Sequence, residues 1–387
     1  MELGPVTQDV EILYVGFVLG YGGDALHMLD LASSVAKRGR KVRIMVPLLD
    51  ACVPFVQRCL DHGIAAERSP LIHADAHGAR NSIFHLLRFF RTYRAPILHL
   101  HTGDICLPRS VLLSLDIVRP RHVFATIHSS YNEMRPGDTR ARIWAASVSR
   151  RLDMVFCPSR HGYDTQHAYG VRTERLKTIY NGVDVEHFCG GNPLNAWSAL
   201  GVAAGTPLIV FSSRIEREKR PLEVIEAFRR IAAEFPDVHL VFVGRGEMQE
   251  QTREVAASSG VAERIHLVGY QHNVPDWLAA ATVWALPTEV ENFSLAVLEA
   301  LAAGCPILST LCQGNDEVLV AGKNALTVAV GDIDGQVQGL RRLLSEPDLR
   351  KRLRVAARET AGNYDVEHMV NQYLNCYDNA LLRSRQC

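Results

Sequence analysis

The chain has 387 residues, and 42 Lys and Arg residues against 42 Asp and Glu residues give a formal net charge of zero at pH 7. This length is typical of two domains. Hydrophobic residues make up 47% and charged residues 22%, which is ordinary globular usage and excludes a disordered or low-complexity protein. The balanced charge argues against a nucleic-acid binder that depends on overall basicity. We therefore expect two packed cores and no nucleic-acid partner.

The cysteines and the N-terminus indicate where the protein works. Nine cysteines stand singly, without a C-x-x-C pair, which is typical of reduced thiols in a cytoplasmic protein. The first 20 residues carry acids where a signal peptide carries its basic region, and no apolar run approaches the ~18–20 residues of a membrane span. We expect a cytoplasmic protein with at most peripheral membrane contact.

The first 180 residues alternate short apolar runs with helix-length segments. The first run, Ile12 to Val18, ends at a glycine-rich turn, and helical spacing begins at Ala25. Further strand candidates are residues 42–46, 97–100, 122–127 and 154–157. This rhythm predicts a parallel sheet with helices on both faces.

The rhythm repeats after a turn at Asn181-Gly-Val-Asp184, which marks a domain boundary. The strand candidates here are residues 208–211, 239–243, 265–268, 283–286, 307–309 and 326–328. A helix is predicted over 221–235 because Pro221 suits a first turn and the apolar residues share one face. Closing helices are expected over 334–345, 347–361 and 365–382, and the last needs a hydrophobic surface. The sequence thus predicts an α/β protein of two β/α/β domains.

The strongest chemical signal is the segment from Glu289 to Gly304. A helix is expected over 293–303, with Asn292 as its N-cap and Gly304 at its end. Glu291 precedes this helix, and Glu299 lies on nearly the same face as the cap. Free N–H groups at a helix start bind anions, and flanking carboxylates accept bonds from hydroxyl pairs. The pattern suits a diphosphate joined to sugars on both sides; the alternative is an ordinary capped helix with solvated acids.

Two cations stand in the same block. Arg214 follows the strand candidate 208–211, and Lys219 comes just before the helix that starts at Pro221. Ligands bind at the carboxyl ends of the strands in open α/β sheets, so both cations can face one ligand there. The alternative is a solvated charged loop with weak internal ion pairs.

These motifs resemble a known family. Asn181-Gly-Val-Asp184, Arg214 with Lys219, Val243-Gly-Arg-Gly246, and Glu291-x7-Glu299 followed by Ala-Leu-Ala-Ala-Gly-Cys-Pro306 resemble the C-terminal half of retaining family-4 glycosyltransferases of the GT-B fold. Gly22-Gly23 and Thr126-Ile-His128 extend the resemblance over nearly the whole chain.

The resemblance implies a fold and an activity. Two Rossmann-like domains face each other across a cleft: residues 1–180 bind the acceptor, residues 181–364 bind the nucleotide sugar, and a helix over 365–387 returns to the first domain. The implied reaction moves a sugar, with retained configuration, from a nucleotide diphosphate to an acceptor hydroxyl of a glycan, glycolipid or natural product. A UDP-sugar is favoured by family frequency, and neither a cofactor nor a metal is implied.

The resemblance also assigns residues. Arg214 and Lys219 bind the donor diphosphate, Glu291 meets hydroxyls of the transferred sugar, and Glu299 holds the ribose. His128 contacts the donor sugar, and Gly22 and Gly23 let the backbone approach donor or acceptor. The remaining donor-binding candidates are Asn292, Phe293, Ser294 and Leu295, and Tyr270 and Gln271, which line the base. Family members often read Glu-Gly-Phe-Gly where this chain reads Glu291-Asn-Phe-Ser294. Because side chains replace two glycines beside the sugar, donor identity stays open.

Three other functions remain possible. Gly20-Tyr-Gly22-Gly-Asp-Ala25 also satisfies the G-x-G-x-x-A fingerprint of an NAD-dependent oxidoreductase. That function needs an acid at the end of the second strand, and the nearest, Asp50, comes late. The second and third functions keep the two-domain fold: an epimerase of sugar nucleotides that needs no acceptor, and a catalytically silent subunit that binds sugar nucleotides.

Two further features have ambiguous meanings. His99-Leu-His101 resembles the start of a metal site, but no third and fourth ligand follow at a convincing spacing, so we expect one histidine to face the cleft and the other to pack. The basic and aromatic segment 80–94 is either a helix with a basic outer face or a contact for anionic lipid or an anionic acceptor.

Residues 1–180 hold 23 Lys and Arg against 16 Asp and Glu, so the first domain is basic and the second acidic.

Overall fold

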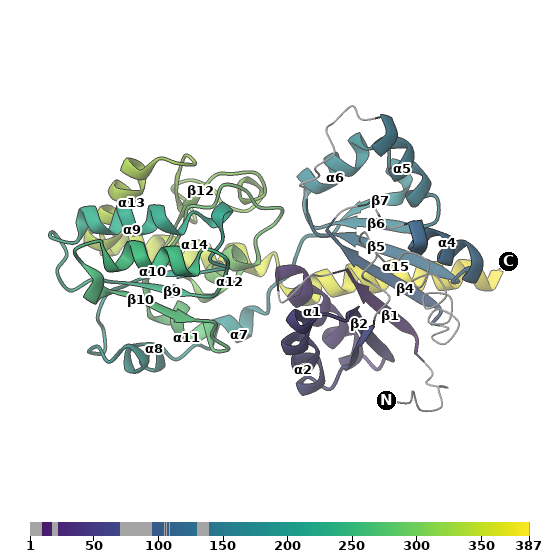
Figure 1. Ribbon diagram of the computed structural model, residues 1–387, viewed down its shortest axis with the longest axis horizontal. Coiled ribbons are helices and arrows are strands. Elements are labelled where there is room, and N and C mark those ends of the chain that lie inside the picture. The colour runs from purple at the N-terminus through teal and green to yellow at the C-terminus, as the bar shows by residue number, and fades with distance from the viewer. Residues whose placement is uncertain are drawn as a thin grey trace. The chain divides into compact units, whose positions relative to one another are not determined.

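The computed structural model describes residues 10–17, 22–69, 95–103, 105, 107, 109–129 and 139–386. The segment 80–94, with its possible lipid or acceptor contact, lies outside the described residues. The chain divides into two compact units, of which one combines Met1–Asn181 with Glu367–Cys387 and the other is Gly182–Val366 (Figure 1). We call them the N-terminal and C-terminal units.

The described residues of the N-terminal unit form one parallel sheet in the order β3-β2-β1-β4-β5-β6-β7. Its strands are β1 (Ile12–Gly16), β2 (Val42–Pro47), β3 (Ala65–Ser69), β4 (Ile97–Thr102), β5 (His122–Ile127), β6 (Met154–Cys157) and β7 (Leu176–Thr178). The strand order reverses between β1 and β4, which is the switch point where ligands bind in doubly wound sheets.

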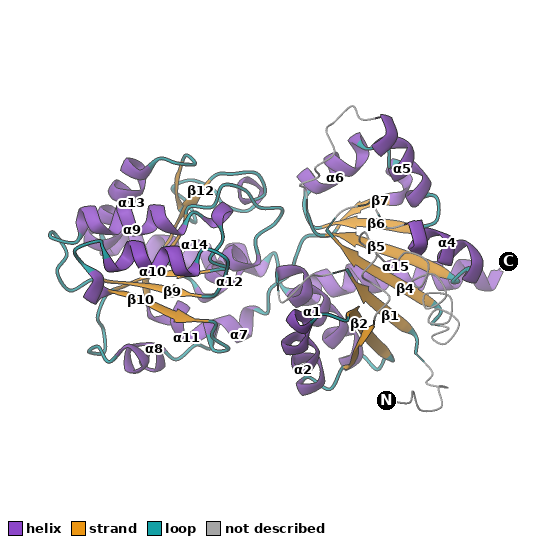
Figure 2. Ribbon diagram, viewed as in Figure 1, coloured by secondary structure: helices purple, strands orange, loops and turns teal. Residues whose placement is uncertain are grey.

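Helices cover this sheet on both faces (Figure 2). They are α1 (Gly23–Lys37), α2 (Val53–Asp61), α4 (Arg109–Val118), α5 (Thr139–Ser149), α6 (Arg160–Ala168) and α15 (Val366–Gln386). The final helix α15 packs Tyr373 against Phe156 and Tyr377 against Phe124, and both tyrosines are fully buried. The sheet thus supplies the hydrophobic surface that the closing helix needs.

The C-terminal unit repeats the architecture, with described strands in the order β10-β9-β8-β11-β12-β13, all parallel. They are β8 (Leu208–Ser212), β9 (His239–Val243), β10 (Ile265–Gly269), β11 (Ala281–Leu286), β12 (Ile307–Thr310) and β13 (Leu326–Val328). The helices are α7 (Val185–Cys189), α8 (Pro193–Leu200), α9 (Pro221–Ile231), α10 (Gln249–Ala257), α11 (Val274–Ala280), α12 (Leu295–Ala303), α13 (Ile333–Ser345) and α14 (Pro347–Gly362).

The two Rossmann-like sheets confirm the predicted fold class. The sequence did not predict β3 and β7, because β3 carries charged and small residues and β7 is only three residues long, and both lie at sheet edges, where apolar patterning is weakest. The helix predicted over 221–235 ends at Ile231. Among the described helices, none is long and apolar enough to cross a membrane. The cysteines that the structure describes are free thiols.

Candidate active site

Two loops are tied together at the carboxyl edge of the C-terminal sheet. They follow β8 and β11, the central pair on either side of the point where this strand order reverses. The backbone N–H of Glu289 donates to the carbonyl oxygen of Glu218 at 2.7 Å, and the Thr288 hydroxyl donates to the same oxygen at 3.1 Å. The acids and cations singled out from the sequence therefore stand on neighbouring loops.

A buried ion pair joins Lys219 and Glu291 across these loops. The Lys219 Nζ lies 2.7 Å from a Glu291 carboxylate oxygen, and the two side chains are 9% and 10% exposed. Both charges are desolvated, so each depends on the other, and removal of one leaves an uncompensated buried charge. The solvated-loop interpretation is wrong for Lys219.

Arg214 behaves differently from Lys219. Its side chain is 50% exposed and pairs with Glu216 and, at 3.4 Å, with Glu218 of its own loop. Partial burial, followed by the neighbouring carboxyl of Glu218, raises the pKa of Glu216. Internal pairs of this exposed kind are weak, so Arg214 can leave them for a stronger anion at small cost.

Glycines let the adjoining loops approach closely. A Cβ on Gly246 would lie 2.3 Å from the carbonyl oxygen of Ile215, and one on Gly244, which has φ +143°, would lie 2.0 Å from that of Ser213. On the other side, a Cβ on Gly314 would lie 2.5 Å from the carbonyl oxygen of Glu291, whose N–H donates to Gln313. The loops after β8, β9, β11 and β12 are thus closely packed along one edge of the sheet.

The helix that ends this edge begins later than the sequence predicts. Helix α12 starts at Leu295, and its N-cap is Ser294, whose hydroxyl accepts the N–H of Val297. The prediction of a helix from Phe293 with Asn292 as cap is wrong: Phe293 is buried just before the helix, and serine provides the cap. Gly304 ends the helix with φ 73°, as predicted.

The later start of α12 changes the position of Glu299 relative to the N-cap. This residue is the fifth of α12 and is partly buried. Counted from Ser294, it stands about 140° around the helix from the cap, so the prediction that Glu299 lies on nearly the same face as the cap is wrong. Its assignment to the ribose rests on the family resemblance and stays a prediction.

The two base-lining candidates follow β10. Tyr270 is 36% exposed and packs edge-on against His272, while the Gln271 side-chain amide donates to the carbonyl oxygen of Val268 at 2.8 Å. An exposed aromatic ring at a strand end offers a stacking surface. A base-binding role stays a prediction for both residues.

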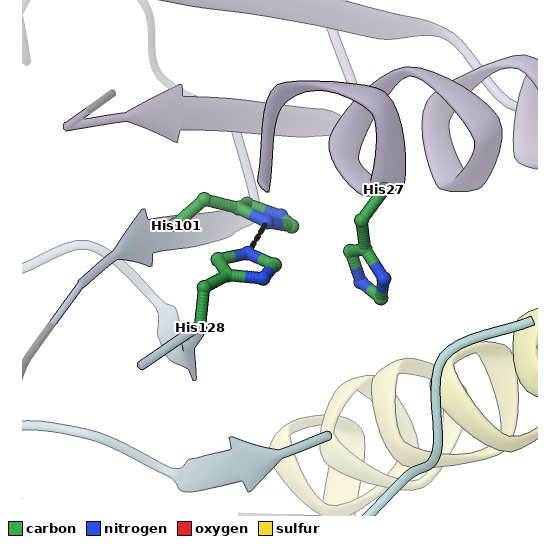
Figure 3. A group of neighbouring side chains, drawn as sticks. All are labelled: His27, His101 and His128. Carbon is green, nitrogen blue, oxygen red and sulfur yellow. Dashed lines mark hydrogen bonds between the residues drawn. The ribbon is translucent and has the colours of Figure 1, made fainter. Parts of the chain in front are cut away.

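In the N-terminal unit, His128 follows β5 and meets two other histidines (Figure 3). His101 at the end of β4 places Nδ1 3.0 Å from Nε2 of His128, with the rings stacked. His27 comes from α1 and turns its ring edge toward His128, with ring centroids 4.9 Å apart.

All three imidazoles are neutral at pH 7. Burial lowers the pKa of His27 and His101 well below the usual value, and burial likewise lowers the pKa of His128 to about 3. His99 is fully buried as well; its ring nitrogens lie 2.6 Å from the Tyr377 hydroxyl and 2.9 Å from Thr126 Oγ1. The expectation that one of His99 and His101 faces a cleft is wrong, because both are buried.

The three-histidine cluster is a possible metal site, whereas the sequence analysis expects no metal. Among the described residues, His27, His101 and His128 are the group that could hold an ion, with ligand atoms within 4.8 Å of one another. The sequence analysis did not connect His27 and His128 with His101, because both are distant from it in the sequence. Three neutral imidazoles fit zinc chemistry, but two of these nitrogens face each other in a hydrogen bond. That no metal binds stays a prediction.

The described end of the glycine-rich turn begins α1, the helix that carries His27. Gly22 is the N-cap of α1, and its carbonyl oxygen accepts the N–H of Leu26 at 3.0 Å. A Cβ on Gly22 would lie 2.8 Å from an Asp24 carboxylate oxygen. Gly20 and Tyr21 lie outside the described residues, and the contact of Gly22 and Gly23 with a donor or acceptor stays a prediction.

Solved structures share this fold. Anabaena HepE in complex with UDP and glucose superposes with a TM-score of 0.80 at 19% identity, covering 95% of this chain and 98% of that chain. WaaG, a glycosyltransferase involved in lipopolysaccharide biosynthesis, gives a TM-score of 0.71 at 17% identity, covering 94% and 98%. The fold is therefore that of the GT-B glycosyltransferases.

Sequence comparison gives the family. The model described as Glycosyltransferase Family 4 matches residues 21–187, and that described as Glycosyl transferases group 1 matches residues 198–360. The chain belongs to the family-4 glycosyltransferases, as its motifs indicated.

Curated relatives are similar over different lengths. N-acetyl-alpha-D-glucosaminyl L-malate synthase of Bacillus anthracis is 26% identical over 230 residues, which are 59% of this chain and 60% of the relative. A D-inositol 3-phosphate glycosyltransferase of Nocardiopsis dassonvillei is 30% identical over 54% of this chain and 51% of the relative. The chain thus matches about half to three fifths of these two proteins. A D-inositol 3-phosphate glycosyltransferase of Corynebacterium urealyticum is 25% identical over 92% of this chain and 90% of the relative.

Proposed function

We propose that this protein transfers a sugar from a nucleotide diphosphate, with a UDP-sugar favoured, to an acceptor hydroxyl with retention of configuration. The observation that carries the proposal is the buried pair of Lys219 and Glu291 at the closely packed carboxyl edge of the C-terminal sheet. A cation and a carboxylate held side by side match a donor with an anionic and a hydroxyl-rich end. Relatives named as glycosyltransferases and the UDP complex of HepE support it.

The reaction needs positive charge where the diphosphate leaves. The bond from the anomeric carbon to the phosphate oxygen breaks, the acceptor oxygen bonds to the same face of that carbon, and a phosphate oxygen takes the acceptor proton. Lys219 and Arg214 stabilise the departing charge, together with N–H groups at the start of α12. Each such donor is worth about 2–4 kcal/mol in a preorganised site. Glu291 accepts bonds from hydroxyls of the transferred sugar.

The N-terminal unit contributes neutral groups. We assign His128 to a hydroxyl of the donor sugar, because its neutral imidazole offers a hydrogen bond without a charge that would compete for the diphosphate. The excess of Lys and Arg in residues 1–180 favours an anionic acceptor, such as a phosphorylated glycan or glycolipid. An acceptor KM that rises with salt supports this assignment, and a salt-independent KM removes it.

NMR of the anomeric proton tests the reaction. Purified protein is incubated with UDP-glucose, UDP-N-acetylglucosamine, UDP-galactose or GDP-mannose, with and without hydroxyl acceptors, and the product anomer is read from its coupling constant. We expect a new linkage of the donor's configuration, lost in Glu291→Gln and kept in the matched control Glu289→Gln, whose side chain is 56% exposed.

Different outcomes would overturn parts of the proposal. An inverted linkage contradicts retention. A changed sugar nucleotide without acceptor establishes the epimerase function, whereas tight binding without turnover establishes a silent binding subunit. NADH binding, seen by fluorescence, would restore the oxidoreductase hypothesis.

A further inference from the structure

The contact between His101 and His128 has a direction. Their facing nitrogens, His101 Nδ1 and His128 Nε2, lie 3.0 Å apart, so one carries a proton and the other accepts it (Figure 3). Two protonated nitrogens would repel, and two bare nitrogens would leave the contact without a hydrogen. The tautomer of one histidine therefore determines that of the other.

The far nitrogen of His101 decides between the two arrangements. Its Nε2 is buried and has no hydrogen-bond partner among the described residues. If the His101 proton sat there, a buried N–H would be orphaned, and such groups are rare in folded proteins. The proton is better placed on Nδ1, where it makes a hydrogen bond.

We propose that His101 is a positioning residue for His128: its Nδ1–H donates to His128 Nε2 and thereby holds His128 in the tautomer that carries its proton on Nδ1. His128 then acts on the donor sugar as a hydrogen-bond donor through Nδ1. This role rests on the proposed function, whereas the tautomer itself does not.

The surroundings keep this arrangement in place. Both rings are neutral because burial lowers the pKa of each, so each carries a single ring proton. The ring centroids of His99 and His101 lie 4.4 Å apart, and the ring of His27 packs edge-on against that of His128. The His99 nitrogens are occupied by Tyr377 and Thr126, so this neighbour does not compete for His101.

The chain offers informative replacements. His101→Asn keeps an N–H donor near the position of Nδ1, whereas His101→Leu removes every ring hydrogen bond at similar volume. Tyr377→Phe is the matched control, because it deletes a buried hydroxyl of the same cluster that bonds His99 and not His128.

Nitrogen-15 NMR of histidine-labelled protein without substrates tests the tautomer, with His128 assigned by its loss in His128→Gln. We expect the His128 proton on Nδ1 in the wild type, in His101→Asn and in Tyr377→Phe, and a mixture of both tautomers in His101→Leu. With a donor sugar and acceptor, kcat should fall about tenfold in His101→Leu with KM nearly unchanged, and recover in His101→Asn.

Several results would overturn the inference. The first is a His128 proton on Nε2 in the wild type, and the second is an unchanged tautomer and kcat in His101→Leu. The third is stoichiometric Co²⁺ binding with d–d absorption that His27→Gln abolishes, since the cluster would then be a metal site. If His101→Leu does not fold, the wild-type spectrum and His101→Asn still decide. Absent transfer activity with the expected tautomer would count against the proposed function alone.

Discussion

Both units bury polar groups, which are charged in one unit and neutral in the other. In the C-terminal unit Lys219 and Glu291 form a buried ion pair. In the N-terminal unit His27, His99 and His101 are buried and His128 is partly buried, all as neutral rings. A departing diphosphate needs fixed charge, whereas sugar hydroxyls need only hydrogen bonds. Under the proposed function, we therefore expect charged groups of the C-terminal unit to be needed for departure of the diphosphate, and neutral groups of the N-terminal unit to add hydrogen bonds only.

The largest expected effect comes from removing a charge of the ion pair in the C-terminal unit. Lys219→Ala removes a cation from the departing diphosphate, so we expect kcat for sugar transfer to fall about 10²–10³-fold. The measurement is steady-state turnover of the UDP-sugar. Lys323→Ala removes an exposed lysine of the same unit and should leave the rate unchanged. A normal rate in well-folded Lys219→Ala would remove Lys219 from the site.

The close packing of the charged edge can be disrupted separately. Gly246→Ala places a Cβ 2.3 Å from a backbone oxygen of Ile215, and the backbone must shift. We expect a loss of about 2–4 kcal/mol in the free energy of unfolding, measured with denaturant. Gly362→Ala is the control, since a Cβ there meets nothing within 4 Å. Equal stability of both variants would show that the loops are not packed as described.

As pH falls, the N-terminal unit with its neutral histidines should lose stability first. The folded-state pKa of His27, His99, His101 and His128 lies below the unfolded value near 6.5, so below that pH the unfolded chain binds more protons. Their contribution to stability is complete above pH ~6.5 and shrinks as pH falls, by at most about 1.4 kcal/mol per histidine and pH unit.

The C-terminal unit has fewer histidines of this kind: burial lowers the pKa of His239 in β9 and of His266 in β10, and both are only partly buried. Hydrogen bonds from Arg229 and then Arg230 lower the pKa of Glu226 to about 2, so its contribution is lost only as pH falls below ~4.5. Hydrogen exchange at pH 7.0 and 5.5 should therefore show faster opening in β4, β5 and α15 than in β8 and β11. Equal acceleration in β8 and β11 and in β4, β5 and α15 would contradict the neutral-histidine assignment.

The smallest effect is expected for one hydroxyl. Tyr373→Phe removes the group that contacts Thr126 Oγ1 at 3.2 Å and His27 Nε2 at 3.3 Å. We expect a loss of about 1 kcal/mol in unfolding free energy, with little change in kcat. A large fall in kcat at unchanged stability would instead connect Tyr373 to His128.

The sequence predicted most strands of both sheets and the neighbourhood of Lys219 and Glu291, because apolar periodicity and strand ends carry that information locally. It could not predict that Lys219 pairs with Glu291 while Arg214 pairs within its own loop, because this depends on how far each side chain is buried. It also missed the meeting of His27, His101 and His128, which are distant in sequence and converge only through the strand order. The start of α12 was misplaced because Asn292 and Ser294 are both good caps, and packing of Phe293 decides between them.

Calorimetric titration of UDP tests most directly whether the C-terminal unit binds the donor diphosphate through Lys219. Wild-type protein and Lys323→Ala should bind UDP with the same Kd, and Lys219→Ala should weaken binding by about tenfold or more, since a charge-assisted contact to phosphate is lost. An equal Kd for Lys219→Ala, or no UDP binding by the wild type, would contradict the assignment.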